Sequence, residues 1–186
     1  EYEGVRVRIK GNLGNARISL QIDIGFGDVI VPGPGKVAYP ALLEFPPAEL
    51  NGYTMETTIA EKLQAMVKLG ILNSRMKDFY DIWMLSNKFD FDGEVLAEAI
   101  ESTFKNRKTD LTNDPAVFDP SFGRDGTKQA QWQAFIRKAR LSNVPEEFED
   151  VVVDIKMFLE QPVRSLVNRR PFDSKWKASG YWVATS

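Results

Sequence analysis

Hydrophobic and polar side chains alternate strictly along the first part of the chain. Valine and isoleucine stand between basic residues from Val5 to Lys10, and the same period of two returns from Ile18 to Ile24. Because successive side chains of a strand point to opposite faces, each stretch predicts a strand with one apolar face. The Gly/Asn-rich residues 11–15 join them, so we predict an antiparallel β-hairpin. Its polar face carries Arg6, Arg8, Lys10 and Arg17, with Asp23 near its end.

The period changes after a Pro-rich apolar segment. Residues 38–53 predict an extended or short-strand connection between two parts of the chain. From Thr54 onward, apolar positions recur every three or four residues, which is typical of helices. We predict residues 109–126 to be a loop with at most one turn. The predicted helices lie near 56–70, 75–87, 93–106, 125–140 and 145–160.

Strands that precede helices predict an α+β fold, with an N-terminal antiparallel hairpin followed by a helical bundle. We therefore divide the chain into a β-rich part over 1–53, a helical domain over 54–163 and a C-terminal tail over 164–186. The tail is basic and aromatic and has no clear period. It predicts a surface arm, a docking strand or a partly disordered segment.

Composition narrows the possible chemistry. The 186 residues include no Cys and no His, which excludes disulfides, thiol nucleophiles, Ser-His-Asp triads and the usual zinc sites. Carboxylates remain, and they favour hard ions such as Mg²⁺. The net charge of −2 gives no global field that attracts nucleic acid. No apolar run reaches the length of a membrane span, so we expect a cytoplasmic protein without a membrane partner.

Charged residues occupy two helix faces that the pattern assigns to the core. Lys62 lies three residues after Ile59 and four before Met66, on or beside an apolar stripe. Its stem could cover apolar surface while its amine reaches water, or the amine could face a polar cleft. Glu61 and Lys68 lie nearer the outer side and are expected to be solvated.

The next predicted helix has two aspartates at a spacing of three. Asp78 shares a face with apolar residues, and Asp81 adjoins that face. Two such carboxylates can meet one cation, whereas the alternative is that the helix dipole favours Asp78 near the N-terminus. Arg75 and Lys77 could also pair locally with these acids. Ser74 is the predicted N-cap.

These features together resemble the nucleotidyltransferase toxins of the abortive-infection AbiEii/AbiGii family. The matching elements are E-K-x-x-A-M at 61–66, R-x-K-D-x-x-D at 75–81, and the strand ARISLQIDIGFGD at 16–28 with the Pro/Gly loop after it. The resemblance extends from about residue 5 to residue 140. It implies a polymerase-β-like nucleotidyltransferase core followed by a helical domain.

The resemblance also implies an activity, namely the Mg²⁺-dependent transfer of a nucleotide from an NTP to an acceptor, with RNA and especially tRNA ends in some members. It implies a toxin of a phage-defence system with a cognate antitoxin protein as partner. Lys62 would contact the NTP, Asp78 would be the catalytic aspartate and Asp81 its second carboxylate. Arg75 and Lys77 could help bind phosphate. Asp23 would be a metal-site carboxylate.

One family motif has no counterpart here. The family's first motif, a Gly-Ser followed at about ten residues by Asp-x-Asp, should precede the hairpin. Asp90-Phe91-Asp92 is the only Asp-x-Asp, and it predicts a loop with Asp92 near a helix cap. We therefore expect a fragment of a larger transferase with an incomplete active site.

Two other interpretations remain open. A catalytically inactive binding module could dock a neighbouring gene product through the aromatic tail. The basic hairpin face could instead bind RNA, although the net acidity disfavours this.

Overall fold

The computed structural model describes residues 4–178 and 180–185. It confirms the predicted hairpin, in which β1 (Gly4–Leu13) pairs antiparallel with β2 (Ala16–Gly25). The turn is tighter than expected, because Leu13 pairs directly with Ala16. Gly14 has a φ of 59°, a conformation that costs glycine little.

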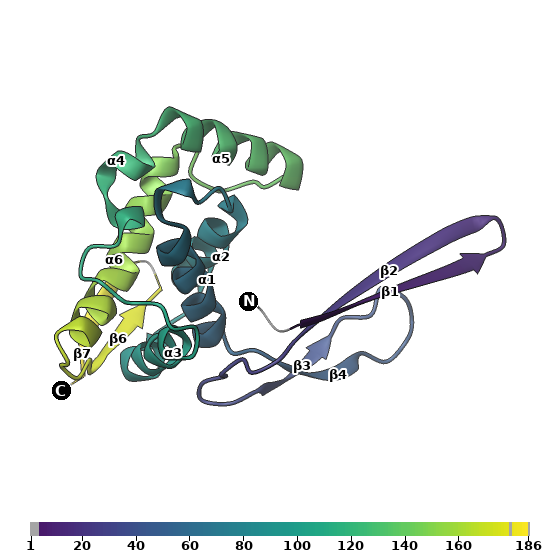
Figure 1. Ribbon diagram of the computed structural model, residues 1–186, viewed down its shortest axis with the longest axis horizontal. Helices are drawn as coiled ribbons and strands as arrows, with labels where there is room; N and C mark the ends of the chain where they lie inside the picture. Colours follow the sequence, from purple (N-terminus) through teal and green to yellow (C-terminus); the bar gives the residue numbers. More distant parts are fainter. Residues whose placement is uncertain (1–3, 179, 186) are drawn as a thin grey trace.

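A second hairpin occupies the Pro-rich segment, where we predicted an extended connection. Strand β3 (Gly35–Tyr39) pairs antiparallel with β4 (Ala48–Gly52). Figure 1 shows both hairpins to one side of the helices, with β1 and β2 extending away from them. The β-rich part is therefore built from two separate two-stranded sheets.

The five predicted helices are all present, with shifts at their ends. They are α1 (Met55–Leu69), α2 (Met76–Lys88), α3 (Gly93–Asn106), α5 (Gly126–Ala139) and α6 (Phe148–Val167). The predicted loop contains short turns, η2 (Ala116–Phe118) and α4 (Pro120–Gly123), and η1 (Gly70–Leu72) follows α1. Strands followed by helices confirm the α+β class. Within the described residues, no helix is long and apolar enough to cross a membrane.

Two predicted helix caps had different outcomes. Asp92 caps α3 as predicted, since its side chain accepts the backbone N–H groups of Glu94 and Val95. The prediction that Ser74 caps α2 was wrong. Asn73 Oδ1 accepts the Arg75 backbone N–H at 2.8 Å. The side chain of Asn73, one residue before Ser74, therefore provides the hydrogen bond just before this helix.

The core lies between the helices. Apolar stripes of α1, α2, α3 and α6 face one another, and their central side chains are almost fully excluded from solvent. Phe79 of α2 stacks on Phe122 and meets Phe148 edge-on, with ring centroids 5.7 and 5.1 Å apart. Its fully buried members include Ile59, Leu63, Ile82, Leu96, Ile100, Trp132 and Phe158.

Helix α6 continues to Val167, past the predicted end at residue 160 and past the expected boundary at 163. Pro162 lies inside it and has no N–H, so the carbonyl of Phe158 loses its usual helical donor. The indole Nε1 of Trp182 donates to that carbonyl at 3.0 Å. A residue from the tail thus replaces the hydrogen bond that proline removes.

The last described residues pack on the helices. Strand β6 (Ser174–Lys177) pairs with β5 (Phe91–Asp92) and with β7 (Tyr181–Ala184). Trp176 is only 2% exposed, and its Nε1 donates to the Ser86 carbonyl at 2.7 Å. Of the three expectations for the tail, residues 174–178 and 180–184 agree with the docking strand and not with a surface arm or a disordered segment, because β6 pairs with β5 and Trp176 is buried.

Candidate functional site

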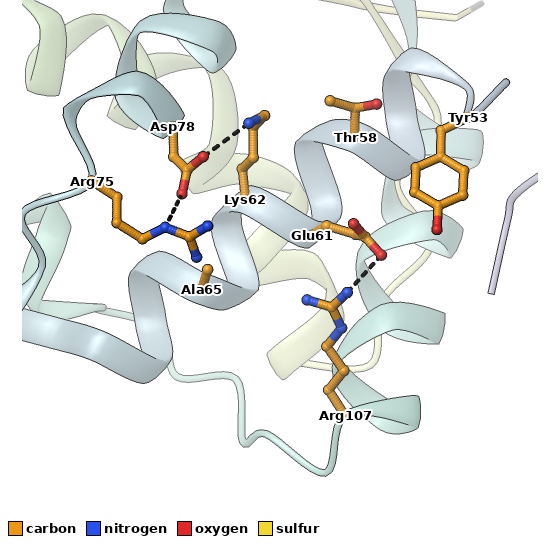
Figure 2. Close-up of a pocket in the computed structure, with 8 residues that line it drawn as sticks. All are labelled: Tyr53, Thr58, Glu61, Lys62, Ala65, Arg75, Asp78 and Arg107. Carbon is orange, nitrogen blue, oxygen red and sulfur yellow. Dashed lines mark hydrogen bonds and ion pairs between the residues drawn. The ribbon is translucent and has the colours of Figure 1, made fainter. Parts of the chain in front are cut away.

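A polar pocket of about 350 Å³ opens beside α1, between the start of α2 and the residue that follows α3. Figure 2 shows its walls, with Lys62 and Asp78 at one end and Tyr53 at the other. Three ion pairs join its lining residues, Lys62–Asp78 and Arg75–Asp78 toward one end and Glu61–Arg107 nearer the other. The lining residues are Tyr53, Thr58, Glu61, Lys62, Ala65, Arg75, Asp78 and Arg107.

Lys62 is held by two carboxylates. Its Nζ lies 2.9 Å from Asp78 Oδ1 and 2.7 Å from Asp81 Oδ2, and its side chain is 17% exposed. The amine is thus held by two carboxylates at the wall of the pocket and is not a freely solvated surface group. Burial lowers the pKa of Lys62, but the hydrogen bonds and negative charges of Asp81 and Asp78 outweigh burial and hold the pKa above its ordinary value. The lysine is therefore positively charged at neutral pH.

The two aspartates lie three residues apart, about one turn of α2, and both contact Lys62. Their side chains are 9% and 15% exposed for Asp78 and Asp81. Arg75 Nε lies 3.1 Å from Asp78 Oδ2, and Lys77 Nζ lies 2.6 Å from Asp81 Oδ2, so the local pairing considered from the sequence is present. Both of these cations are largely exposed and form the rim of the cluster.

One carboxylate oxygen stands out. Asp78 Oδ2 is buried and receives no hydrogen bond with acceptable geometry from the described residues. Buried polar atoms in proteins are nearly always hydrogen-bonded, to protein, to water or to a ligand. Because Asp78 also lines the pocket, this oxygen is an acceptor that a bound molecule could satisfy.

A second charged network, which the sequence did not predict, lies on the other side of the pocket. Arg107 Nη2 is 2.6 Å from Glu61 Oε1 and 3.4 Å from Asp28 Oδ1, and its Nη1 donates to Gln64 Oε1 at 3.2 Å. The Tyr53 hydroxyl donates to Asp28 Oδ2 at 2.6 Å. These contacts join the loop after β2 to α1 and to the end of α3.

The expectation that Glu61 is solvated was wrong. Its side chain is 22% exposed because Arg107 covers it. Burial raises the pKa of Glu61, while the positive charge of Arg107 acts in the opposite direction without cancelling the effect. Helical periodicity alone predicted an exposed Glu61, because the repeat within α1 does not reveal that Arg107, which follows α3, packs on that face.

Asp23 lies apart from the other predicted residues. It is 56% exposed and pairs across the hairpin with Arg6, whose Nε is 2.6 Å away. Hydrogen bonding to Arg6 lowers the pKa of Asp23. Asp23 lines a second, neighbouring pocket of about 580 Å³, which shares only Tyr53 and Glu61 with the first.

A divalent metal such as Mg²⁺ would need several oxygen ligands gathered at one of these pockets. Within residues 4–178 and 180–185, no three acidic side chains are gathered as a metal site. Asp78 and Asp81 already face Lys62, and Asp23 faces Arg6. The described carboxylates therefore do not fit a resident Mg²⁺ ion by themselves.

The Asp-x-Asp at 90–92 makes structural contacts, as expected, but Phe91 and Asp92 form strand β5 and not the predicted loop. Asp90 pairs with Lys177 at 2.8 Å and accepts the Ala178 backbone N–H at 2.8 Å. Asp92 caps α3. Neither residue lines the two pockets around α1.

A lysine held between carboxylates beside a pocket, after β-hairpins and within a helical bundle, is compatible with the phosphate chemistry of a nucleotidyl transferase. The family model of the nucleotidyl transferase AbiEii toxin of type IV toxin–antitoxin systems matches residues 1–153. The chain belongs to this AbiEii family, which confirms the resemblance that the motifs indicated.

The family match covers both N-terminal hairpins and helices α1 to α5, and it ends inside α6. The β6–β7 hairpin lies beyond it. Membership implies a nucleotide substrate and an antitoxin partner. No curated protein and no solved structure matches the chain.

Proposed function

We propose that this chain carries the NTP-binding and catalytic helices of an Mg²⁺-dependent nucleotidyltransferase toxin, which transfers a nucleotide from an NTP to an RNA acceptor such as tRNA. The observation that carries the proposal is the pairing of Lys62 with Asp78 and Asp81 beside an open polar pocket. A lysine whose pKa is shifted by burial and by charged partners, at the wall of a pocket, is a candidate functional group.

Lys62 is proposed to bind the triphosphate. An ammonium group has three N–H donors, and Asp78 and Asp81 account for two of them. The third can reach a phosphate oxygen, and the two carboxylates keep the amine charged and fixed in position. Arg75 and Lys77, which are exposed at the rim, are proposed to add positive charge for phosphate or for the RNA backbone.

Asp78 is proposed to orient the acceptor hydroxyl through its buried Oδ2, which is ion-paired with Arg75 but accepts no hydrogen bond of acceptable geometry from the described residues. In the transfer, the acceptor oxygen forms a bond to the α-phosphorus and the bond between the α-phosphorus and the bridging oxygen breaks. The hydroxyl proton passes to a base and pyrophosphate leaves. Asp78 is close enough to the pocket to be that base, while Asp81 positions Lys62.

Mg²⁺ enters this proposal as the companion of the NTP. When bound, it would neutralise charge on the triphosphate. Asp23 stays a candidate metal-site carboxylate from the family resemblance, although it faces Arg6. The antitoxin is proposed as the protein partner, in keeping with the family.

The test is transfer of label from α-³²P-labelled NTP to RNA, measured together with calorimetric binding of the NTP. We expect Lys62→Met to weaken NTP binding by at least tenfold and Asp78→Asn to reduce transfer by at least a hundredfold. Matched controls are Lys68→Met and Asp150→Asn, which remove the same charges from exposed positions on α1 and α6. Unchanged binding and transfer in both site variants would refute the site.

A binding module without catalysis is the second candidate, and one observation favours it: the described carboxylates do not form a three-residue metal site. It predicts NTP binding that depends on Lys62, with no transfer to any RNA. Measuring binding and transfer on the same samples separates the two functions.

A further inference from the structure

We propose that Tyr53 is the stacking platform for the base of the bound nucleotide. This inference rests on the proposed function, since it places the base of the NTP whose phosphates Lys62 would hold. Tyr53 lines both pockets beside α1, and its side chain is 44% exposed. A partly exposed aromatic ring that lines two pockets offers apolar surface on which a nucleobase can stack.

The backbone at Tyr53 is fixed. It lies between the end of β4 and the N-cap of α1, Thr54, whose Oγ1 accepts the Thr57 backbone N–H at 3.1 Å. The same hydroxyl donates to the Val31 carbonyl at 2.5 Å, which ties this point to the segment after β2. The ring is therefore attached to a rigid junction.

The phenol group is fixed as well. Its hydroxyl donates to Asp28 Oδ2 at 2.6 Å, and Asp28 is in turn 3.4 Å from the Arg107 guanidinium. Arg107 is anchored by Glu61 and Gln64 on α1. A ring that is already oriented loses little conformational entropy when a base stacks on it, which favours binding.

The position of Tyr53, two residues before α1, suits the size of a nucleotide. Lys62 lies seven residues after Met55, the first residue of α1, which corresponds to roughly 10 Å at a rise of 1.5 Å per residue, and Tyr53 lies two residues before Met55. That span is on the scale of an extended nucleoside triphosphate. Figure 2 shows Tyr53 and the Lys62–Asp78 pair at opposite ends of the pocket, with Thr58 and Glu61 between them. The phosphates and the base would therefore occupy the two ends.

The experiment compares two ligands that differ in the base. Mg·ATP and magnesium tripolyphosphate are titrated calorimetrically into the wild-type chain, Tyr53→Ala and Tyr53→Phe. We expect Tyr53→Ala to weaken ATP binding about tenfold and to leave tripolyphosphate binding unchanged. Tyr53→Phe keeps the ring and should retain most of the ATP affinity. Tyr39→Ala, which removes a 63%-exposed tyrosine outside both pockets, is the matched control and should bind like wild type.

Several outcomes would overturn the inference while leaving the proposed function intact. One is that Tyr53→Ala and wild type bind ATP with equal affinity. Another is that Tyr53→Ala loses affinity for ATP and for tripolyphosphate by the same factor. A third is that wild type binds the two ligands with equal affinity. A fourth is a loss confined to a short single-stranded RNA, which would assign the ring to the acceptor. If wild type binds neither ATP nor tripolyphosphate, the proposed function fails, and this inference fails with it.

Discussion

The helical part and the β1–β2 hairpin follow equally regular hydrophobic patterns, but only the helical part buries its apolar face. Ile59 and Ile82 are fully buried, whereas Val7 and Leu20 of the hairpin are 37% and 57% exposed. Helices α1, α2, α3 and α6 supply one another with a second layer. Two strands alone provide no such layer. The spacing of hydrophobic residues in the sequence therefore shows which face of an element is apolar, but whether that face is buried depends on what packs against it.

Charged residues show the same contrast. The Arg6–Asp23 pair on the hairpin is more than half exposed on both sides, and such surface pairs contribute little to stability. The Lys62–Asp78 pair is 17% and 9% exposed, so each charge depends on the other. This difference is why we assign function to the helical cluster and regard the hairpin pair as a surface contact.

The largest expected difference between the two regions comes from the core. Trp176→Ala should lower the free energy of unfolding by about 3–5 kcal/mol, because it removes a buried ring and the donor to the Ser86 carbonyl. Leu20→Ala, its hairpin counterpart, should change that free energy by less than about 1 kcal/mol. Urea unfolding followed by circular dichroism measures both. Similar losses in the two variants would contradict the contrast.

The next effect concerns the buried charges. Lys62→Met should lower the free energy of unfolding by about 2 kcal/mol at pH 7, because Asp78 and Asp81 lose their shared partner. The loss is smaller than for a fully buried pair, since the cluster is partly exposed. Adding Asp78→Asn and Asp81→Asn to Lys62→Met should restore part of the stability. A triple variant less stable than Lys62→Met would show that the carboxylates do not repel each other.

The Lys62 contribution should also depend on pH. The folded-state pKa of Lys62 is raised above its unfolded value, so its stabilisation is fully present below about pH 10. It is lost as the pH rises through the folded-state pKa. Urea unfolding of wild type and Lys62→Met from pH 7 to 11 should show a gap that is constant at first and narrows above about pH 10. A gap that widens in that range would contradict the assignment.

The smallest effect tests the tail. Trp182→Phe keeps an aromatic ring on Phe158 but removes the indole donor to the carbonyl that Pro162 leaves open. We expect a loss of about 1 kcal/mol in the free energy of unfolding. In a Pro162→Ala background the backbone can supply its own donor, so the same change should cost less. An equal cost in both backgrounds would show that the two residues are not coupled.

Sequence reasoning recovered the local features of this fold well. Alternation predicted the β1–β2 hairpin, and helical spacing placed Lys62, Asp78 and Asp81 on faces that the structure brings together. The hairpin depends on residues that are close together in the chain, and the faces that carry the three charged residues follow from the helical repeat.

Long-range contacts were not predictable in the same way. Arg107 meets Glu61 and Asp28 across 46 and 79 residues, and no spacing rule links such distant positions. The tail hairpin was also missed, because strands of four residues carry little periodic signal. Asp28 lies five residues after Asp23, in the same motif of strand and loop. Its place in that motif was the sequence signal that could have pointed to the network around Arg107.

The most direct test of the account is the calorimetric affinity of Mg·ATP for wild type, Lys62→Met and Lys68→Met, each first shown to be folded. We predict that Lys62→Met binds at least tenfold more weakly, while Lys68→Met, which removes an exposed lysine from the same helix, binds like wild type. Equal affinities in all three proteins would contradict the claim that the Lys62–Asp78–Asp81 cluster is a nucleotide site.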